Sequence, residues 1–207
     1  MIRVAIAGAS GYTGVELIRI LSQHPQTELK AITSRGQAGQ RLDEYYPSLR
    51  GHCKLVFEEP EPALLAEKVD LVFTALPHQA AMDFVPELLQ RDLKVIDLSA
   101  DYRFRDPNIY ENWYQPHKTP ELLSQAVYGL PELHRSQIRR ARLVGNPGWY
   151  PTSVILALAP LLASRLILKQ SIIADSKSGV TGAGRGASLA THFCEVNEGL
   201  KAYKITE

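Results

Sequence analysis

The sequence contains little cysteine. Cys53 and Cys194 are the two cysteines among 207 residues, too few for a disulfide framework or for a zinc site built on cysteines. Low cysteine usage is typical of a reducing compartment, and we interpret both thiols as buried or incidental. No metal site is predicted. Stability must then come from a packed core, for which a hydrophobic content of 45% is ample.

Long apolar runs are also missing. The longest apolar stretch, 153–163, is interrupted by Pro160 and is followed by Arg165, so it is well short of the roughly 20 residues that cross a bilayer. The residues from Met1 to Ala7 leave no room for a signal peptide. We therefore expect a soluble, cytoplasmic chain that does not enter the membrane.

Neither sign of charge predominates. The chain has 23 basic and 22 acidic residues and a net charge of +1, which does not indicate a polyanion partner, so we expect no nucleic-acid ligand. The densest basic stretch, 135–142, is interpreted as a solvated helix face. A length of 207 residues allows one large domain, or one complete domain with part of another.

The first 100 residues alternate β-branched apolar runs with amphipathic stretches, a pattern that predicts parallel strands joined by helices. Pro86 should kink or divide its helix, and segment 105–121, rich in proline and aromatics, is either a functional excursion or a loop packed by its rings. Strands are expected at 2–7, 28–33, 54–57, 70–75 and 94–98, with helices at 13–23 and 79–90. Later come an apolar run at 142–145, a helix at 151–164, a strand candidate at 171–174, a glycine-rich turn at 179–186 and a helix at 187–199.

Glycines recur between the first expected strand and the first expected helix. Their spacing is Gly-x-x-Gly-x-x-Gly, which is not the commonest dinucleotide fingerprint, and an ordinary glycine turn is the alternative. The strand-turn-helix setting favours a dinucleotide site, because glycines allow close backbone approach and a helix N-terminus attracts a pyrophosphate. The residues expected to line the pyrophosphate are Gly8, Ser10, Gly11, Tyr12, Thr13 and Gly14.

The end of the second expected strand predicts which dinucleotide binds. An NAD site usually places a carboxylate there, against the ribose 2′-hydroxyl. This chain instead has Ser34 and Arg35 after Thr33, and a guanidinium suits a 2′-phosphate. The expected cofactor is therefore NADP, with a merely solvated Arg35 as the alternative.

Five motifs occur in order along the chain: Gly8–Gly14, Asp97–Arg103, Tyr128–Glu132, Asn146–Thr152 and Ser178–Arg185. With these motifs the chain resembles, along its whole length, the N-acetyl-γ-glutamyl-phosphate reductases of arginine biosynthesis, which belong to the semialdehyde dehydrogenase superfamily. Tyr203–Glu207 also resembles the family.

The resemblance implies an α/β fold, namely a doubly wound Rossmann-type parallel sheet followed by part of an α+β substrate and dimerisation domain. The NADP-binding domain would cover 1–146, and the incomplete second domain 147–207. The implied reaction reduces N-acetylglutamyl 5-phosphate to N-acetylglutamate 5-semialdehyde with NADPH and releases phosphate. The implied partners are this small acyl phosphate or semialdehyde, and other copies of the complete chain in a dimer or tetramer.

The resemblance also implies roles for single residues. Arg103 would bind a phosphate or carboxylate of the substrate, with an internal ion pair to Asp101 or Asp106 as the alternative. Asn146 would orient the reacting groups beside position 149, where the family has its cysteine nucleophile. Further contacts to the cofactor are implied for Leu76, Pro77, Ser99, Gly182 and Gly184, although the last two also fit a plain structural turn.

Position 149 of this chain is tryptophan, which has no nucleophilic atom. The resemblance places the family's histidine base beyond Glu207. We therefore expect the 207-residue chain to be inactive as given. An NADP-binding pseudoenzyme or partner subunit is one alternative, and a reductase of aminoadipyl or aspartyl phosphates is another.

Overall fold

The computed structural model describes residues 1–203. They form two compact units, Met1–Ala174 and a shorter unit that starts at Asp175. Lys204 to Glu207, the end of the last family-like motif, lie outside the described residues.

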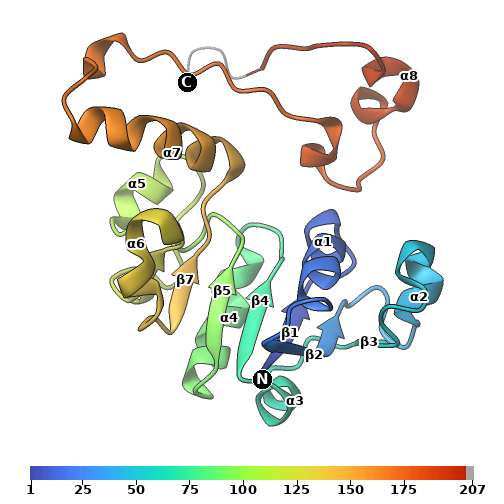
Figure 1. Cartoon of the computed structure of the whole chain (residues 1–207). Coiled ribbons are helices and arrows are strands. Elements are labelled where there is room, and N and C mark those ends of the chain that lie inside the picture. Colours follow the sequence, from blue (N-terminus) through green and yellow to red (C-terminus); the bar gives the residue numbers. More distant parts are fainter. Residues whose placement is uncertain (204–207) are drawn as a thin grey trace. The chain divides into compact units, whose positions relative to one another are not determined.

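A parallel sheet of seven strands forms the centre of the first unit (Figure 1). Its order is β3-β2-β1-β4-β5-β7-β6, and every pairing within it is parallel. The order runs in both directions from β1, which confirms the predicted doubly wound α/β fold. The strands are β1 (Ile2–Ala7), β2 (Thr27–Thr33), β3 (Phe57–Glu58), β4 (Leu71–Thr74), β5 (Lys94–Asp97), β6 (Ala126–Tyr128) and β7 (Leu143–Gly145).

Helices cover both faces of this sheet, because alternate residues of each buried strand point to opposite sides. In β1, Val4 and Ile6 pack with Ile18 of α1, whereas Ala5 packs in a second cluster with Val85 of α4. The helices are α1 (Tyr12–Leu21), α2 (Leu42–Tyr45), α3 (Pro62–Lys68), α4 (Ala80–Gln90), α5 (Pro107–Glu111), α6 (Pro131–Ile138) and α7 (Trp149–Ala163). Short 3-10 turns occur at Pro47–Leu49, Pro120–Leu122 and Lys169–Ser171.

Four expected strands, 2–7, 28–33, 70–75 and 94–98, are confirmed with end shifts of one residue at most. The expected strand 54–57 is mostly wrong, since β3 contains only Phe57 and Glu58, and Val56 forms an isolated antiparallel bridge with Arg41. Pro86 lies within α4 and does not divide it. Segment 105–121 contains the short helix α5. The Asp106 side chain caps this helix by accepting a hydrogen bond from the backbone N–H of Asn108 at 2.9 Å.

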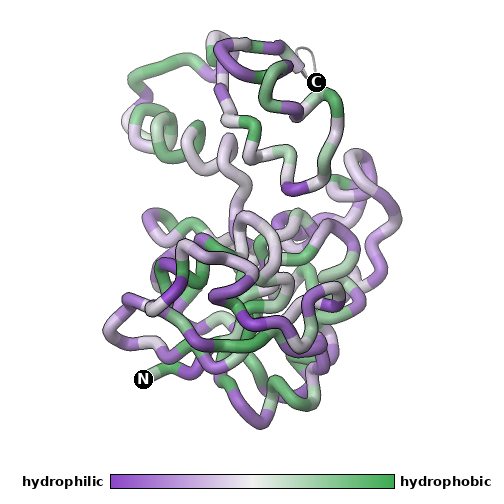
Figure 2. The backbone as a smooth tube through the Cα atoms, turned by 90° about the vertical axis from the view of Figure 1, so that its right-hand side faces the viewer, coloured by the Kyte–Doolittle hydropathy of each residue, from purple (hydrophilic) through white to green (hydrophobic). Residues whose placement is uncertain are grey.

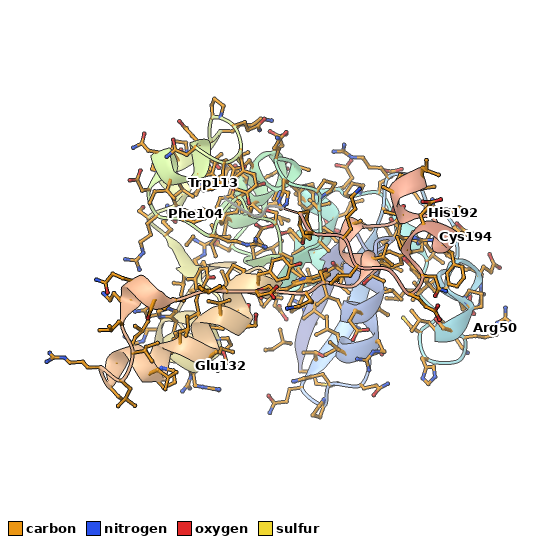
Figure 3. The ribbon with its side chains drawn as sticks, turned by 90° about the horizontal axis from the view of Figure 1, so that it is seen from above. Arg50, Phe104, Trp113, Glu132, His192 and Cys194 are labelled. Carbon is orange, nitrogen blue, oxygen red and sulfur yellow. The ribbon has the colours of Figure 1, made fainter. Side chains whose placement is uncertain are left out.

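The expected strand 171–174 is absent: Ser171 ends a 3-10 turn, and residues 172–174 pair with no strand of the described chain. In the second unit, the expected helix 187–199 is replaced by a 3-10 turn at Leu189–Thr191 and a short helix α8 (Phe193–Val196). Figure 3 labels His192, the residue directly before this helix, and Cys194 within it. The glycine-rich stretch forms a 3-10 turn at Val180–Ala183.

Helix α7 is apolar but has no buried residue. Figure 2 shows its second half as hydrophobic, and Leu161 on that half is exposed. Among the described residues, none of the helices combines the length and the apolar character that a membrane span requires.

Candidate functional site

The turn after β1 passes very close to the end of β4. Gly8 and Ala9 donate their backbone N–H groups to the carbonyl of Thr33, at 3.1 and 3.0 Å, so the turn also lies against the end of β2. Gly8 has a φ of +85°, and a Cβ there would lie 2.5 Å from the carbonyl oxygen of Ala75. Only glycine fits such an approach. The turn therefore lies at the carboxyl ends of three neighbouring strands.

Helix α1 begins directly after this turn. Gly11 is its N-cap residue, and glycine has no side chain with which to cap the helix. The amide N–H groups of a first helical turn carry a partial positive charge. Tyr12 and Thr13 are exposed there, whereas Gly14 is buried. The arrangement is one that binds a phosphate or pyrophosphate.

Side chains from two other segments support the turn. The Ser10 and Ser34 hydroxyls lie 2.9 Å apart, which joins the turn to the end of β2. The Tyr46 hydroxyl donates to the Ser10 carbonyl at 2.6 Å and approaches the Gly11 carbonyl at 3.3 Å. Tyr46 was not predicted from the sequence, because 36 residues separate it from Ser10. Arg35 follows Ser34 and is exposed just beyond the carboxyl end of β2.

The loop after β5 begins with a buried carboxyl group. Asp97 accepts hydrogen bonds from the hydroxyls of Thr74 and Ser99, both at 2.6 Å. Because Thr74 ends β4 and Asp97 ends β5, the Thr74 bond joins the ends of two central strands, and the Ser99 bond holds the loop after β5. Burial raises the pKa of Asp97 to about 6, and the hydroxyl donors partly oppose that rise. Ser99 is buried and supports the loop from within.

A second buried carboxylate, that of Asp101, joins the loops that follow β4 and β5. The Asp101 carboxylate accepts hydrogen bonds from the backbone N–H of Gln79 at 2.8 Å and from the Tyr110 hydroxyl at 2.9 Å. Gln79 has a φ of +76°, which is uncommon for a residue other than glycine. The predicted cofactor contacts Leu76 and Pro77 belong to the loop fixed in this way, the first half-buried and the second exposed.

Arg103 connects the loops that follow β5 and β7. Its Nε donates to the Asn146 carbonyl at 2.8 Å, and its Nη2 donates to the Leu98 carbonyl at 2.9 Å. The sequence left open an ion pair with Asp101 or Asp106. In the structure, the Asp101 carboxylate instead accepts hydrogen bonds from Gln79 and Tyr110, and the Asp106 carboxylate accepts one from Asn108 at the start of α5. Burial lowers the pKa of Arg103, although its guanidinium remains charged at neutral pH.

Trp149 is the first residue of α7, and 62% of its surface is exposed. The preceding Gly148 accepts hydrogen bonds from the Thr152 amide at 3.0 Å and the Thr152 hydroxyl at 2.8 Å. The backbone N–H of Asn146 donates to the carbonyl of Asp97, the last residue of β5, at 2.7 Å. A Cβ added at Gly148 would lie 3.2 Å from Nη1 of Arg103. Asn146 and Trp149 thus lie along the turn after β7, and the Arg103 side chain reaches this turn from the loop after β5.

Gly182 and Gly184 belong to the second unit. Gly184 has a φ of +82° at the end of a 3-10 turn, and a Cβ there would meet no atom within 4 Å. Their contact with a cofactor stays a prediction. Within residues 1–203, the structure brings together no three His, Cys, Asp or Glu side chains that could hold a metal ion.

Comparison with solved structures supports this fold. Aspartate semialdehyde dehydrogenase II of Vibrio cholerae is similar with a TM-score of 0.60 and 15% identity, over 79% of this chain and 43% of that one. Aspartate semialdehyde dehydrogenase of Candida albicans, solved with NADP, has a TM-score of 0.57 and 17% identity, over 80% of this chain and 47% of that one. At these identities the likeness concerns the fold alone.

Curated relatives are far closer in sequence. N-acetyl-gamma-glutamyl-phosphate reductase of Syntrophobacter fumaroxidans is 70% identical over 207 residues, all of this chain and 60% of the relative. The protein of that name from Citrifermentans bemidjiense is 58% identical over 205 residues, 99% of this chain and 59% of the relative. The chain thus spans about 60% of the length of the curated relatives it matches.

Two family models match consecutive parts of the chain. The semialdehyde dehydrogenase NAD-binding domain matches residues 3–141, which include the glycine turn and the loops around Asp97 and Arg103. The semialdehyde dehydrogenase dimerisation domain matches residues 150–207. Since the first model alone covers more than half of the chain, the protein belongs to the semialdehyde dehydrogenase family.

Proposed function

We propose that this chain provides the NADP-binding domain, residues 1–146, and the first part of the substrate domain, residues 147–207, of an N-acetyl-γ-glutamyl-phosphate reductase. The reaction is the NADPH-dependent reduction of N-acetylglutamyl 5-phosphate to N-acetylglutamate 5-semialdehyde with release of phosphate, in the cytoplasm. The observation that carries the proposal is the 70% identity, along the entire chain, to a relative of that name. The site geometry supports it independently.

The residues around the glycine turn fit a dinucleotide. The close approach at Gly8 leaves no room for a side chain, and the start of α1, whose N-cap residue is a glycine, offers amide donors to a pyrophosphate. The Ser34 hydroxyl, which lies 2.9 Å from the Ser10 hydroxyl of the glycine turn, and the Arg35 guanidinium would hold the ribose 2′-phosphate end. NADPH, when bound, supplies the hydride. Leu76 and Pro77 would border its nicotinamide half, held in place through Asp101.

Arg103 and Asn146 would position the acyl phosphate beside the start of α7. Two of the Arg103 nitrogens are held by backbone carbonyls, so Nη1 is the nitrogen that faces Gly148 and the start of α7. Helix N-termini lower the pKa of a thiol and stabilise a developing oxyanion. A cysteine at position 149 would benefit from both effects, whereas Trp149 has no nucleophile to activate.

Trp149 favours a second candidate function, that of an NADP-binding partner subunit without turnover. The match to a dimerisation domain at 150–207 is consistent with such a role beside an active copy. Both candidates include assembly with other copies of the complete chain. They differ in whether the protein performs chemistry with position 149 as it stands.

A binding experiment tests the cofactor. The two tryptophans are Trp113 and Trp149, so Trp113→Phe leaves Trp149 as the reporter of NADPH binding by fluorescence quenching. We expect NADPH to bind at least ~10-fold more tightly than NADH, the equivalent of ~1.4 kcal/mol. Arg35→Ala should remove this preference, and Arg50→Ala, another exposed arginine, should keep it. Equal affinity for the two dinucleotides in the parent chain would contradict the NADP assignment.

A turnover experiment separates the two candidates. The chain is completed with the C-terminal segment of the Syntrophobacter relative and carries either Trp149 or Trp149→Cys. Phosphate-dependent reduction of NADP is followed with N-acetylglutamate semialdehyde. Turnover by the cysteine form alone supports the reductase site and the inactivity of Trp149. Turnover by the tryptophan form would refute position 149 as the nucleophile, and silence of both with NADPH binding intact would refute the substrate.

A further inference from the structure

Five strands of the sheet end side by side. Their last residues pair in register across the sheet, Thr33 of β2 with Ala7 of β1, Ala7 with Thr74 of β4, Thr74 with Asp97 of β5, and Asp97 with Gly145 of β7. Figure 1 shows β1, β4, β5 and β7 next to one another, with α7 following β7. Because neighbouring strands are ~4.8 Å apart, the end of β7 lies roughly 10 Å from the end of β4. The turn between β7 and α7 therefore lies at the same edge of the sheet as the glycine turn.

The proposed cofactor site gives the dinucleotide a direction along this edge. Ser34 and Arg35, beyond the end of β2, would hold the 2′-phosphate, and the glycine turn beyond β1 would hold the pyrophosphate. The nicotinamide half must then extend the other way, past the ends of β4 and β5 and toward the turn after β7. The proposed reaction requires the same placement, because the acyl group held at position 149 must receive the hydride. A side chain at position 149 is therefore expected beside the nicotinamide ring.

Trp149 presents a large aromatic face at this point. It is the first residue of α7 and is 62% exposed, so its indole is accessible to a ligand. Indole has an electron-rich face that attracts cations more strongly than the other aromatic side chains do. The nicotinamide ring is positively charged in oxidised NADP and uncharged in NADPH. An indole in contact with this ring therefore stabilises the oxidised form more than the reduced form.

We propose that Trp149 stacks on the nicotinamide ring and shifts the preference of this chain toward oxidised NADP. The placement of the ring rests on the proposed function, whereas the preference follows from the indole. A cysteine has no aromatic face, so this preference belongs to a chain with tryptophan at position 149. Such a chain would respond to the oxidation state of the NADP pool without turning the cofactor over.

The Arg103 guanidinium acts in the opposite direction. A Cβ added at Gly148 would lie 3.2 Å from its Nη1, so this cation lies close to the turn and disfavours a positively charged ring beside it. The Asp97 carboxylate interacts favourably with Arg103 through space and partly offsets that charge. Both groups are present whichever side chain occupies position 149. Substitutions at this one position therefore isolate the contribution of the indole.

Calorimetric titration of the 207-residue chain with oxidised NADP and with NADPH measures the two affinities. We expect Trp149→Ala to weaken binding of oxidised NADP roughly fivefold, as for loss of one cation–π contact, and binding of NADPH less than about twofold. An absorption band from electron donation by the indole to the oxidised ring should appear with the parent chain and disappear in Trp149→Ala. Trp113→Ala is the matched control, because Trp113, labelled in Figure 3, is 60% exposed and lies after α5. It should change neither affinity.

The proposal is overturned if Trp149→Ala weakens both forms of the cofactor equally or weakens neither. It is also overturned if Trp149→Ala binds both forms more tightly, because the indole would then obstruct the ring. In each of these cases, binding that still depends on Arg35 leaves the proposed NADP site standing. A selective loss of affinity for oxidised NADP, together with silence of the completed Trp149→Cys chain, would instead support the stacking and refute the proposed substrate.

Discussion

Asp97 is a carboxyl group that the fold buries with two hydroxyl donors and no contacting cation. Burial disfavours its charged form, so its pKa is about 6 in the folded chain, against ~3.9 in an unfolded one. Between these values the folded state holds the proton more tightly than the unfolded state does. The contribution of Asp97 to stability is therefore complete below pH ~4 and is lost as the pH rises to about 6.

Asp97→Asn should remove this pH dependence. An amide keeps the shape and one acceptor for the Thr74 hydroxyl, and the Ser99 hydroxyl can turn to accept from its NH2 group. We expect the variant to gain up to about 3 kcal/mol relative to the parent between pH 4 and pH 7, from ~1.4 kcal/mol for each unit of pKa shift. Urea unfolding at several pH values measures the difference. Parallel curves for the two proteins would show that Asp97 ionises without penalty.

The Tyr46 hydroxyl makes a different kind of contribution, because it holds the Ser10 and Gly11 carbonyls of the turn that would bind the dinucleotide in the proposed site. Tyr46→Phe should cost ~1 kcal/mol of stability, the typical value for one hydrogen bond. It should also weaken NADPH binding roughly fivefold, since a looser turn must be ordered on binding. Thermal melting and fluorescence titration give the two quantities separately. Lower stability with unchanged NADPH affinity would mean that Tyr46 only supports the fold.

The glycine turn between β1 and α1 combines two demands that a matched pair of variants can separate. Gly8 and Gly39 both have a φ of +85°, but a Cβ at Gly8 would overlap the Ala75 carbonyl, while a Cβ at Gly39 meets nothing within 4 Å. Gly39→Ala should cost ~1 kcal/mol through backbone strain alone. Gly8→Ala should cost about 3 kcal/mol and abolish NADPH binding, because the ends of β1 and β4 must separate. Urea unfolding compares the two, and equal costs would show that the close approach is unimportant.

The strands of the first half could be predicted because β-branched runs flanked by helical periods are an unambiguous pattern. β6 and β3 could not, since strands of three and two residues are too short to show a period. The candidate site shows the same difference. Local motifs predict Gly8, Arg103 and Trp149 as site residues, whereas Tyr46 reaches the glycine turn through tertiary packing that no local pattern contains.

Ion pairing shows the same limit. In the sequence, Asp101 and Asp106 lie near Arg103, but the sequence alone does not decide whether the Arg103 guanidinium pairs with one of them or binds an anion of the substrate. The decision depends on Gln79 and Tyr110, which occupy the Asp101 carboxylate from other segments. Such competition for one acceptor becomes visible only when the loops after β4 and β5 are placed together.

At the scale of the whole molecule, apolar side chains from α7 onward remain exposed to solvent. None of the 15 residues of α7 is buried, and Leu166, Leu168 and Ile173 are 71%, 72% and 92% exposed. Exposed apolar surface of this kind favours association. We therefore predict that the 207-residue chain self-associates and binds a hydrophobic dye such as ANS, and that completion with the C-terminal segment of the Syntrophobacter relative reduces both.

Light scattering coupled to gel filtration, run at several protein concentrations beside dye titration, measures this difference. Leu166→Ser with Leu168→Ser should lower dye binding in the 207-residue chain, because these two side chains supply exposed apolar area without supporting the core. The same double substitution should destabilise the completed chain if its added segment covers them. Equal dye binding, solubility and thermal stability of the two parent chains would instead show that the surface from α7 onward is stable in water without further cover.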